Sequence, residues 1–383
     1  MNKNKFTPLI FLASLGAGGI SVIPFAILQY TFYQGEGLVK VSDMNYAAMS
    51  GLQALFFHSL DAVMIIFVII HLVLSFIFLK KLIGFVKSEG YKDFMANPLK
   101  NSAILVPFIS IVMTMNAFIG PVRYFLPVMS ANLQSLMMPA LLFWIFLWAW
   151  LMKVEIKLLK TSFEKGFDMN KITFGWLLHP FALGMMTVTG TGIAAMAKDP
   201  SIAHTAAFLT FVSGTMGIFL LVVKTISVFQ KHFHSQDGLG EKQFLPSFLI
   251  VIPNITLYAL SAFRIGHYLE HHHNMHLDSY FLMVTTLSFA FQTWYMIFGL
   301  ALMRDYFKKH HFKKEHYVTQ WSLICPFVAY AVLGSFVHNV FVQSPVLYGV
   351  IILFMVVAIA FFFDLLRRYM KCNRKSKAGI SCE

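Results

Sequence analysis

Long apolar blocks, each about the length of a membrane-spanning helix, follow one another along the whole chain. A helix needs roughly 20 mostly apolar residues to cross about 30 Å of hydrocarbon, and ten blocks reach that length. Because lipid offers no partners for free backbone N–H and C=O groups, each block is expected to be helical. The blocks fall at 7–32, 49–80, 102–122, 132–154, 173–197, 202–228, 244–266, 277–303, 317–341 and 345–366. The pattern predicts an all-α polytopic membrane protein with ten transmembrane helices.

Composition agrees with a membrane protein rather than a soluble one. Of the 383 residues, 58% are hydrophobic and 12% are charged, whereas soluble domains carry about a quarter charged residues. No long polar stretch separates the apolar blocks, so we expect one ten-helix transmembrane domain at 1–371 and a basic cytoplasmic tail at 372–383. We expect the protein to be integral to a lipid bilayer, namely a bacterial inner (cytoplasmic) membrane.

The basic residues predict the orientation of the helices. All but four of the 30 Lys and Arg residues lie on the side of the membrane that ten helices assign to both chain termini. Basic residues are retained on the cytoplasmic side, so both termini are expected there. The formal net charge of +13 therefore reflects topology and contact with anionic lipid. It does not indicate a nucleic-acid partner, because the basic residues form no patch on a soluble fold.

Proline follows the parity of the expected helices. The odd-numbered helices contain Pro24, Pro107, Pro180, Pro246, Pro253 and Pro326, and beyond its first residue no even-numbered helix contains a proline except Pro139. Proline inside a helix frees a backbone carbonyl and bends the helix, and freed groups suit the inside of a bundle. We therefore expect five helical hairpins around a central pore lined by the odd-numbered helices, with these prolines setting the bends. The alternative is that proline and glycine are simply common in membrane helices.

Histidines form the clearest local cluster, HYLEHHHNMH at 267–276. Imidazoles at such spacing can bind metal, so the alternative function is a membrane-embedded His-cluster metal or haem enzyme. This cluster, however, falls in the expected external loop between helices seven and eight, whereas His310, His311 and His316 fall on the other side. About 30 Å of hydrocarbon keeps the two groups apart. We expect a polar, pH-responsive loop, with no metal site, catalytic residue or cofactor.

Two groups of charged side chains are further candidates. In the second helix, His58 and Asp61 are one turn apart and can share a proton, as proton coupling requires; the alternative is packing against a neighbouring helix. Arg123, Lys198 and Arg264 each end an odd-numbered helix on the outer side. Together they would form a cationic mouth that raises the local anion concentration. The alternative is a solvated rim, because several carboxylates share that side.

The chain resembles the tellurite-resistance/dicarboxylate transporter family, which includes the plant slow anion channels and bacterial TehA-type channels. The resemblance rests on His179-Pro180 with the following TVTGTGIAAMA, and on FLPSFLIVIPNITLYALSAF, SFAFQTWYMIFGL and WSLICPFVAYAVLGS. GAGG in the first helix is similar to the family's opening glycine motif. The resemblance implies a homotrimer with an anion-selective pore in each protomer, and small inorganic or organic anions as substrates.

The resemblance also implies a gate on the ninth helix. Channel members place a phenylalanine four residues after a tryptophan, often followed by proline. Here Trp321 matches the tryptophan, but Cys325 stands at the plug position, followed by Pro326 and Phe327. Either the pore is more open, or Phe327 or another ring occludes it, or the protein works as a carrier. The leading prediction is transport of chloride, nitrate, sulfite-like oxyanions or C4-dicarboxylates, as a channel or a proton-linked permease.

Overall fold

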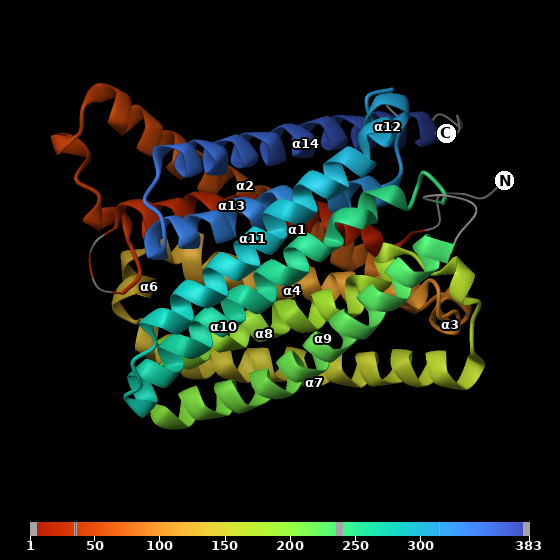
Figure 1. Cartoon of the computed structure of the whole chain (residues 1–383), viewed down its shortest axis with the longest axis horizontal. Helices are drawn as coiled ribbons and strands as arrows, with labels where there is room; N and C mark the ends of the chain where they lie inside the picture. Colours follow the sequence, from red (N-terminus) through yellow and green to blue (C-terminus); the bar gives the residue numbers. More distant parts are fainter. Residues whose placement is uncertain (1–5, 34, 36, 235–239, 314, 378–383) are drawn as a thin grey trace.

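The structure is a computed structural model that describes residues 6–33, 35, 37–234, 240–313 and 315–377. Every regular element in these ranges is a helix, and ten helical spans are long and apolar enough to cross a membrane. The expected helical class and the number of spans are thereby confirmed. The main helices of spans 1 to 10 are, in order, α1 (Phe11–Ile27), α2 (Gly51–Val86), α4 (Val106–Ala117), α7 (Leu133–Lys165), α8 (Leu178–Met196), α9 (Pro200–His234), α10 (Val251–His273), α11 (Asp278–Leu302), α13 (Ile324–Val340) and α14 (Pro345–Lys377) (Figure 1).

The two ends of the bundle carry different connections. One end holds the start of span 1, the C-terminal part of α14, and the short helices α3 (Gly90–Met95) and α12 (Arg304–Tyr306) (Figure 1). We call it the basic end, because the lysine-rich connections of the sequence lie there. The opposite end holds α6 (Pro127–Ala131) and the turn between α10 and α11, and we call it the cavity end.

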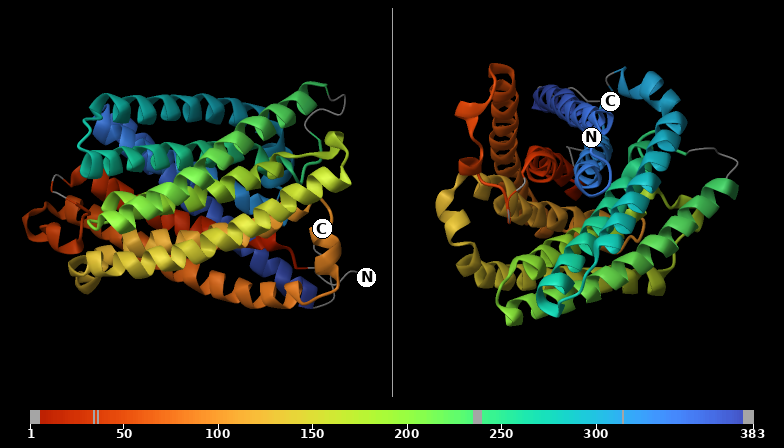
Figure 2. Two further views of the ribbon diagram at one scale, coloured as in Figure 1. Left: turned by 90° about the horizontal axis from the view of Figure 1, so that it is seen from below. Right: turned by 60° about the vertical axis from the view of Figure 1, so that its left-hand side comes forward.

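Odd-numbered spans are buried, and even-numbered spans are exposed. Between 67% and 100% of the most apolar window of each odd span is buried inside the protein, compared with 22% to 44% for the even spans. The odd-span helices contact one another in the order α1, α4, α8, α10 and α13, and α13 returns to α1, so they form a closed ring. The even-span helices lie around this ring (Figure 2), with α2 packed along α1 and α9 along α8. Their apolar outward side chains, such as Ile69, Phe146 and Phe219, suit contact with lipid.

Each inner span begins with a short 3-10 segment at the basic end. These segments are Pro8–Ile10, Asn101–Leu105, Phe174–Leu177, Leu245–Ile250 and Val318–Leu323. Four of the expected kink prolines, Pro107, Pro180, Pro253 and Pro326, lie within the first three residues of the α-helix that follows. The 3-10 segment before each of them runs directly into the α-helix, so these prolines lie inside a continuous helical span, close to the point where 3-10 turns change to α-helix. Pro24, in contrast, lies inside α1 and is followed by a π-helical turn at Leu28–Phe32.

Several helices extend further than the apolar pattern predicts. The polar end of α10 continues to His273, where Asn274 in the left-handed conformation ends the helix, as is common at helix C-termini. The expected histidine loop at 267–276 is therefore wrong for most of its length: His267, His271, His272 and His273 are helical. The helix α14 runs to Lys377, into the segment expected as a tail, and residues 378–383 lie outside the described part.

Gly190, in the TGTG segment of α8, is a point of close packing between the inner and outer layers. A Cβ atom there would lie 2.3 Å from Cζ2 of Trp144 and 2.4 Å from Cγ2 of Thr210, on the two neighbouring outer helices. Trp144 is fixed by its indole hydrogen bond to the carbonyl of Met186 at 3.0 Å. We predict that Gly190→Ala lowers the melting temperature in detergent by several degrees, because overpacking typically costs about 1–3 kcal/mol. Gly349→Ala on α14, where a new Cβ meets nothing within 4 Å, is the matched control; equal melting temperatures would contradict this packing.

His311 is buried at the basic end beside α14. Its Nε2 lies 3.8 Å from Oδ2 of Asp364, which is paired with Arg368, and its ring packs on Phe361 with 5.0 Å between the ring centroids. Burial, reinforced by the Arg368 charge, lowers the pKa of His311 to about 4, although Asp364 opposes the shift. The folded protein therefore binds this proton more weakly than the unfolded chain, in which the pKa is about 6.5.

The shifted pKa of His311 predicts acid destabilisation. Between pH 6.5 and pH 4 the unfolded chain takes up a proton that folded His311 does not, so stability is fully present above this window and falls as the pH decreases through it. Melting temperatures measured across this window should fall less steeply for His311→Gln than for the wild type. His276→Gln, at an exposed position, should keep the wild-type slope. A wild-type slope in His311→Gln would contradict the assignment.

Candidate functional site

A cavity of about 1200 Å³ lies inside the ring of inner helices. All five odd spans contribute to its wall, and it reaches the connections at the cavity end through Gly37, Gln134 and Lys198. Its wall is mostly apolar, with Val22, Leu260 and Val332 among its residues. A chamber built by every inner helix, rather than a crevice between two of them, is suited to hold a solute on the axis of the bundle.

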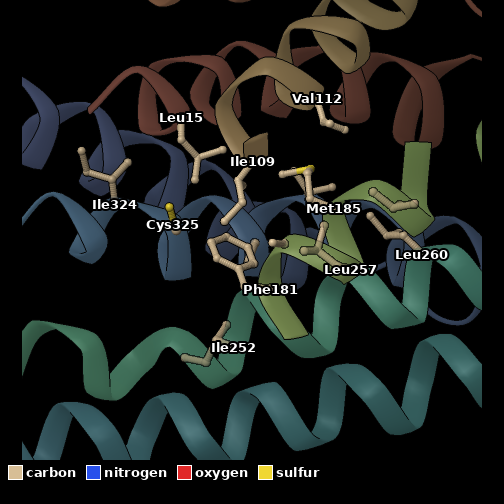
Figure 3. Close-up of a cluster of buried hydrophobic side chains, with 14 of the residues drawn as sticks. Leu15, Ile109, Val112, Phe181, Met185, Ile252, Leu257, Leu260, Ile324 and Cys325 are labelled. Atoms are coloured by element: carbon tan, nitrogen blue, oxygen red, sulfur yellow. The ribbon is translucent and has the colours of Figure 1, made fainter. Parts of the chain in front are cut away.

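The cavity ends at a floor on the side of the basic end. We define the floor by the first residue of each inner span that lines the cavity: Leu15, Met113, Phe181, Pro253 and Cys325. Figure 3 shows Phe181 beside Cys325, with Leu15 above them. Below the floor, Ile109, Ile252 and Ile324 are at most 1% exposed and do not line the cavity. Apolar side chains therefore close the path between the cavity and the basic end.

Among the predicted gate residues, Cys325 alone lines the cavity from span 9. Trp321 is fully buried against Phe362, with 5.5 Å between the ring centroids. Phe327 turns toward the outer helix α14 and stacks on Phe361 at 5.3 Å. The aromatic ring at the floor belongs instead to Phe181 on α8, which the sequence reasoning did not single out.

Only one of the five expected pore prolines lines the cavity. Pro253 belongs to the wall of the cavity, whereas Pro24, Pro107, Pro180 and Pro326 are buried in the helices without lining it. Pro180 still touches the site indirectly, because its carbonyl accepts a hydrogen bond from the hydroxyl of Tyr258 at 2.7 Å.

Arg264 places a positive charge inside the cavity. It lies on α10, nine residues before the helix ends at His273, which corresponds to about 14 Å along the axis, so it is not at the end of its helix as expected. Its Nη1 donates to the carbonyl of Val188 at 2.6 Å. A Cβ atom at Gly192 would lie 3.1 Å from Nη1, so this glycine leaves room for the guanidinium. A guanidinium has five N–H donors, and the bond to Val188 uses one of them.

The rim of the cavity adds further basic groups. Lys198, His271 and His272 line it near the connections, and His267 lies one turn deeper. The ring of His272 is fixed by contact with the carbonyl of Ala197 at 3.0 Å. No aspartate or glutamate occurs among the described residues that line the cavity. A concave, low-dielectric wall with only basic charges attracts anions.

The histidines do not converge on one point. Across the described residues, no group of three His, Cys, Asp or Glu side chains is arranged to hold a metal ion. His267 instead pairs with Glu270, with 3.1 Å between Nδ1 and Oε2, and stacks on Phe281 at 4.5 Å.

Arg123 lies apart from the cavity. It is 2% exposed, and its guanidinium donates to the carbonyls of Ile119, Leu38 and Val39 at 3.0, 3.4 and 2.6 Å. The same side chain also donates to Oγ of Ser130 at 3.1 Å. These contacts tie the connection after span 1 to the end of span 3. The structure thus brings Arg264 and Lys198 to the cavity but uses Arg123 to fix the connections around it.

His58 and Asp61 lie on the outer helix α2, and neither lines the cavity. His58 is exposed and stacks on Tyr46 at 4.5 Å. The Tyr46 hydroxyl donates to Oδ2 of Asp61 at 2.6 Å and contacts the hydroxyl of Tyr124 at 3.1 Å. Asp61 therefore takes its hydrogen bonds from tyrosines. The sequence spacing placed the two groups one turn apart, but it gave no sign that Tyr46 would come between them.

Fold and cavity together define a helical membrane protein with a central, basic, partly closed chamber. Residues 5–368 match the family model described as voltage-dependent anion channel, SLAC1. The chain belongs to this family, which is part of the tellurite-resistance/dicarboxylate transporter family and consists of channels and transporters of anions. A search of curated proteins found no match.

Proposed function

We propose that the protein moves small anions across the membrane through the cavity inside the inner ring. The observation that carries the proposal is a chamber walled by all five inner helices, with Arg264 inside it and no carboxylate among its described lining residues. Lys198 raises the anion concentration at the entrance, and Arg264 offers charge-assisted hydrogen bonds further in. The apolar floor at Phe181 and Cys325 then limits passage.

The floor controls whether an anion can pass from the cavity to the basic end. Because Ile109, Ile252 and Ile324 seal the path below it, an anion passes only when the floor side chains move. We propose Phe181 as the occluding ring, with Cys325 as the small neighbour that gives the ring space. A hydrophobic constriction of this kind excludes water and ions until it opens.

The proposal extends to orientation and assembly. The excess of basic residues supports placing the basic end in the cytoplasm, so the cavity opens to the outside of a bacterial inner membrane. The family resemblance supports a homotrimer, with one cavity in each protomer. Chloride, nitrate, sulfite-like oxyanions and C4-dicarboxylates remain the proposed substrates, because a cavity of about 1200 Å³ admits all of them.

A panel of anions tests the proposed function. Purified protein in proteoliposomes should accelerate uptake of at least one of chloride, nitrate, sulfite and malate over protein-free liposomes. It should leave uptake of potassium unchanged. Each anion is measured with and without a pH gradient, since a proton-linked permease responds to the gradient and a passive channel does not. Uptake equal to that of protein-free liposomes for all four anions would contradict the proposal.

A further inference from the structure

Three titratable side chains from three different spans are buried in the same interior region behind α8. Glu155 comes from α7, His179 from the start of α8 and Lys224 from α9, and they are 0%, 0% and 3% exposed. The Nδ1 atom of His179 lies 2.6 Å from Oε1 of Glu155. The Nζ atom of Lys224 lies 4.1 Å from the ring centre of Trp176 and interacts electrostatically with Glu155 and His179. We call Glu155, His179 and Lys224 the buried trio.

Two atoms of the buried trio have no hydrogen-bond partner. Oε2 of Glu155 and Nε2 of His179 are buried, and within the described part of the chain nothing donates to them or accepts from them. A polar atom buried in this state is unfavourable, so the trio is not a fully satisfied structural network. Both atoms are chemically able to accept a proton. One added proton raises the net charge of the trio by one unit, whichever of its groups binds it.

The buried trio adjoins the floor of the cavity through one helical turn. His179 is followed by Pro180 and then by Phe181, whose ring lies at the floor. The hydroxyl of Tyr258 donates to the carbonyl of Pro180 at 2.7 Å and interacts electrostatically with Glu155. The residue before Tyr258, Leu257, lines the cavity. The groups that face the trio are thus Tyr258 from α10 and Trp176 from the 3-10 segment before α8.

We propose that the buried trio is a proton-binding site whose occupancy is linked to anion binding at the cavity floor; this inference rests on the proposed function. The proton enters at Nε2 of His179 or Oε2 of Glu155, and the added positive charge is balanced by the anion on the other side of α8. A helix is about 10 Å thick, and at an effective dielectric constant of roughly 20 one unit charge at that distance changes anion affinity about tenfold. The linkage is reciprocal, so a bound anion raises proton affinity by the same factor.

Charge-changing variants of the trio test this linkage, because the proposal gives them opposite signs. Glu155→Gln replaces a carboxylate with a neutral amide and so changes the charge of the trio in the same direction as a bound proton, so the apparent affinity for chloride or malate at pH 7.5 should rise about tenfold. Lys224→Gln makes the trio less positive and should lower the apparent anion affinity by a similar factor. His179→Gln should flatten the dependence of affinity on pH between 5.5 and 7.5. Glu164→Gln, the same change at an exposed site on α7, is the control and should behave as the wild type.

A second measurement needs only the wild-type protein, in case a variant fails to fold. When chloride or malate is added to the purified protein in weakly buffered detergent, the protein should take up protons, at most one per bound anion. A pH dye measures this proton uptake. Affinity shifts of the same sign in Glu155→Gln and Lys224→Gln, or anion binding without proton uptake, would overturn the linkage while leaving anion transport intact. Absence of any anion transport by the wild-type protein would instead overturn the proposed function.

Discussion

Replacing Arg264 with Gln should reduce anion uptake by the reconstituted protein by about 10- to 100-fold. Hydrogen bonds to a charged group contribute about 1.5–3 kcal/mol, and Arg264 is the deepest positive charge in the cavity wall. Gln keeps a donor but removes the charge. Arg264→Lys should retain part of the activity, since it restores the charge without the fork of donors. Initial rates of chloride and malate uptake measure the effect.

The control for Arg264 is Lys40→Gln. Lys40 lies at the same end of the molecule but pairs with Asp43 at 3.8 Å and does not line the cavity. The Lys40→Gln substitution removes the same unit of charge as Arg264→Gln, so a general loss of surface potential would affect both variants alike. Equal uptake by Arg264→Gln and the wild type, with unchanged preference for anions over cations, would show that Arg264 does not contact the transported solute.

Replacing Cys325 with Phe should reduce anion uptake at least about tenfold. The new ring would occupy the floor beside Phe181 (Figure 3) and close the space that the small thiol leaves. Extra atoms in a packed site force neighbouring side chains off their preferred conformations, so the floor would open less readily. Uptake rates and melting temperature are measured together, so that a loss of folding is told apart from a closed floor.

Two companion variants define the outcome at the floor. Cys325→Ser changes size little and should stay near the wild-type rate, whereas Phe181→Ala removes the proposed occluding ring and should raise the rate. Wild-type uptake by a folded Cys325→Phe protein would place the anion path away from this floor.

Much of the architecture could be predicted from the sequence because lipid imposes a simple rule on length and polarity. Apolar length alone located ten spans, and the buried spans are the ones that carry most of the prolines. The rule fails where a helix face meets water instead of lipid. The end of α10 has the composition of a polar loop, yet His267, His271 and His272 are helical and line the cavity.

The candidate site was harder to predict, because its side chains meet across spans that are distant in sequence. Glu155 and Lys224 lie near the ends of the predicted apolar blocks and resemble residues of the loops, but α7 and α9 continue beyond them, and both are buried with His179. Arg123 and Arg264 occupy similar places in the sequence, whereas one ties backbone carbonyls together and the other faces the cavity. Such differences depend on which helix lies opposite, and spacing along one chain does not contain that information.

Chemical modification of the Cys325 thiol, followed by a measurement of anion uptake, tests the central claim most directly. A negatively charged methanethiosulfonate reagent attached at the floor should abolish uptake in wild-type proteoliposomes, because it places a fixed anion in the proposed path. Cys325→Ala protein, which keeps Cys372 and Cys382, should transport at the same rate with or without the reagent. If mass spectrometry shows Cys325 fully labelled and uptake is unchanged, the anion does not pass through this cavity.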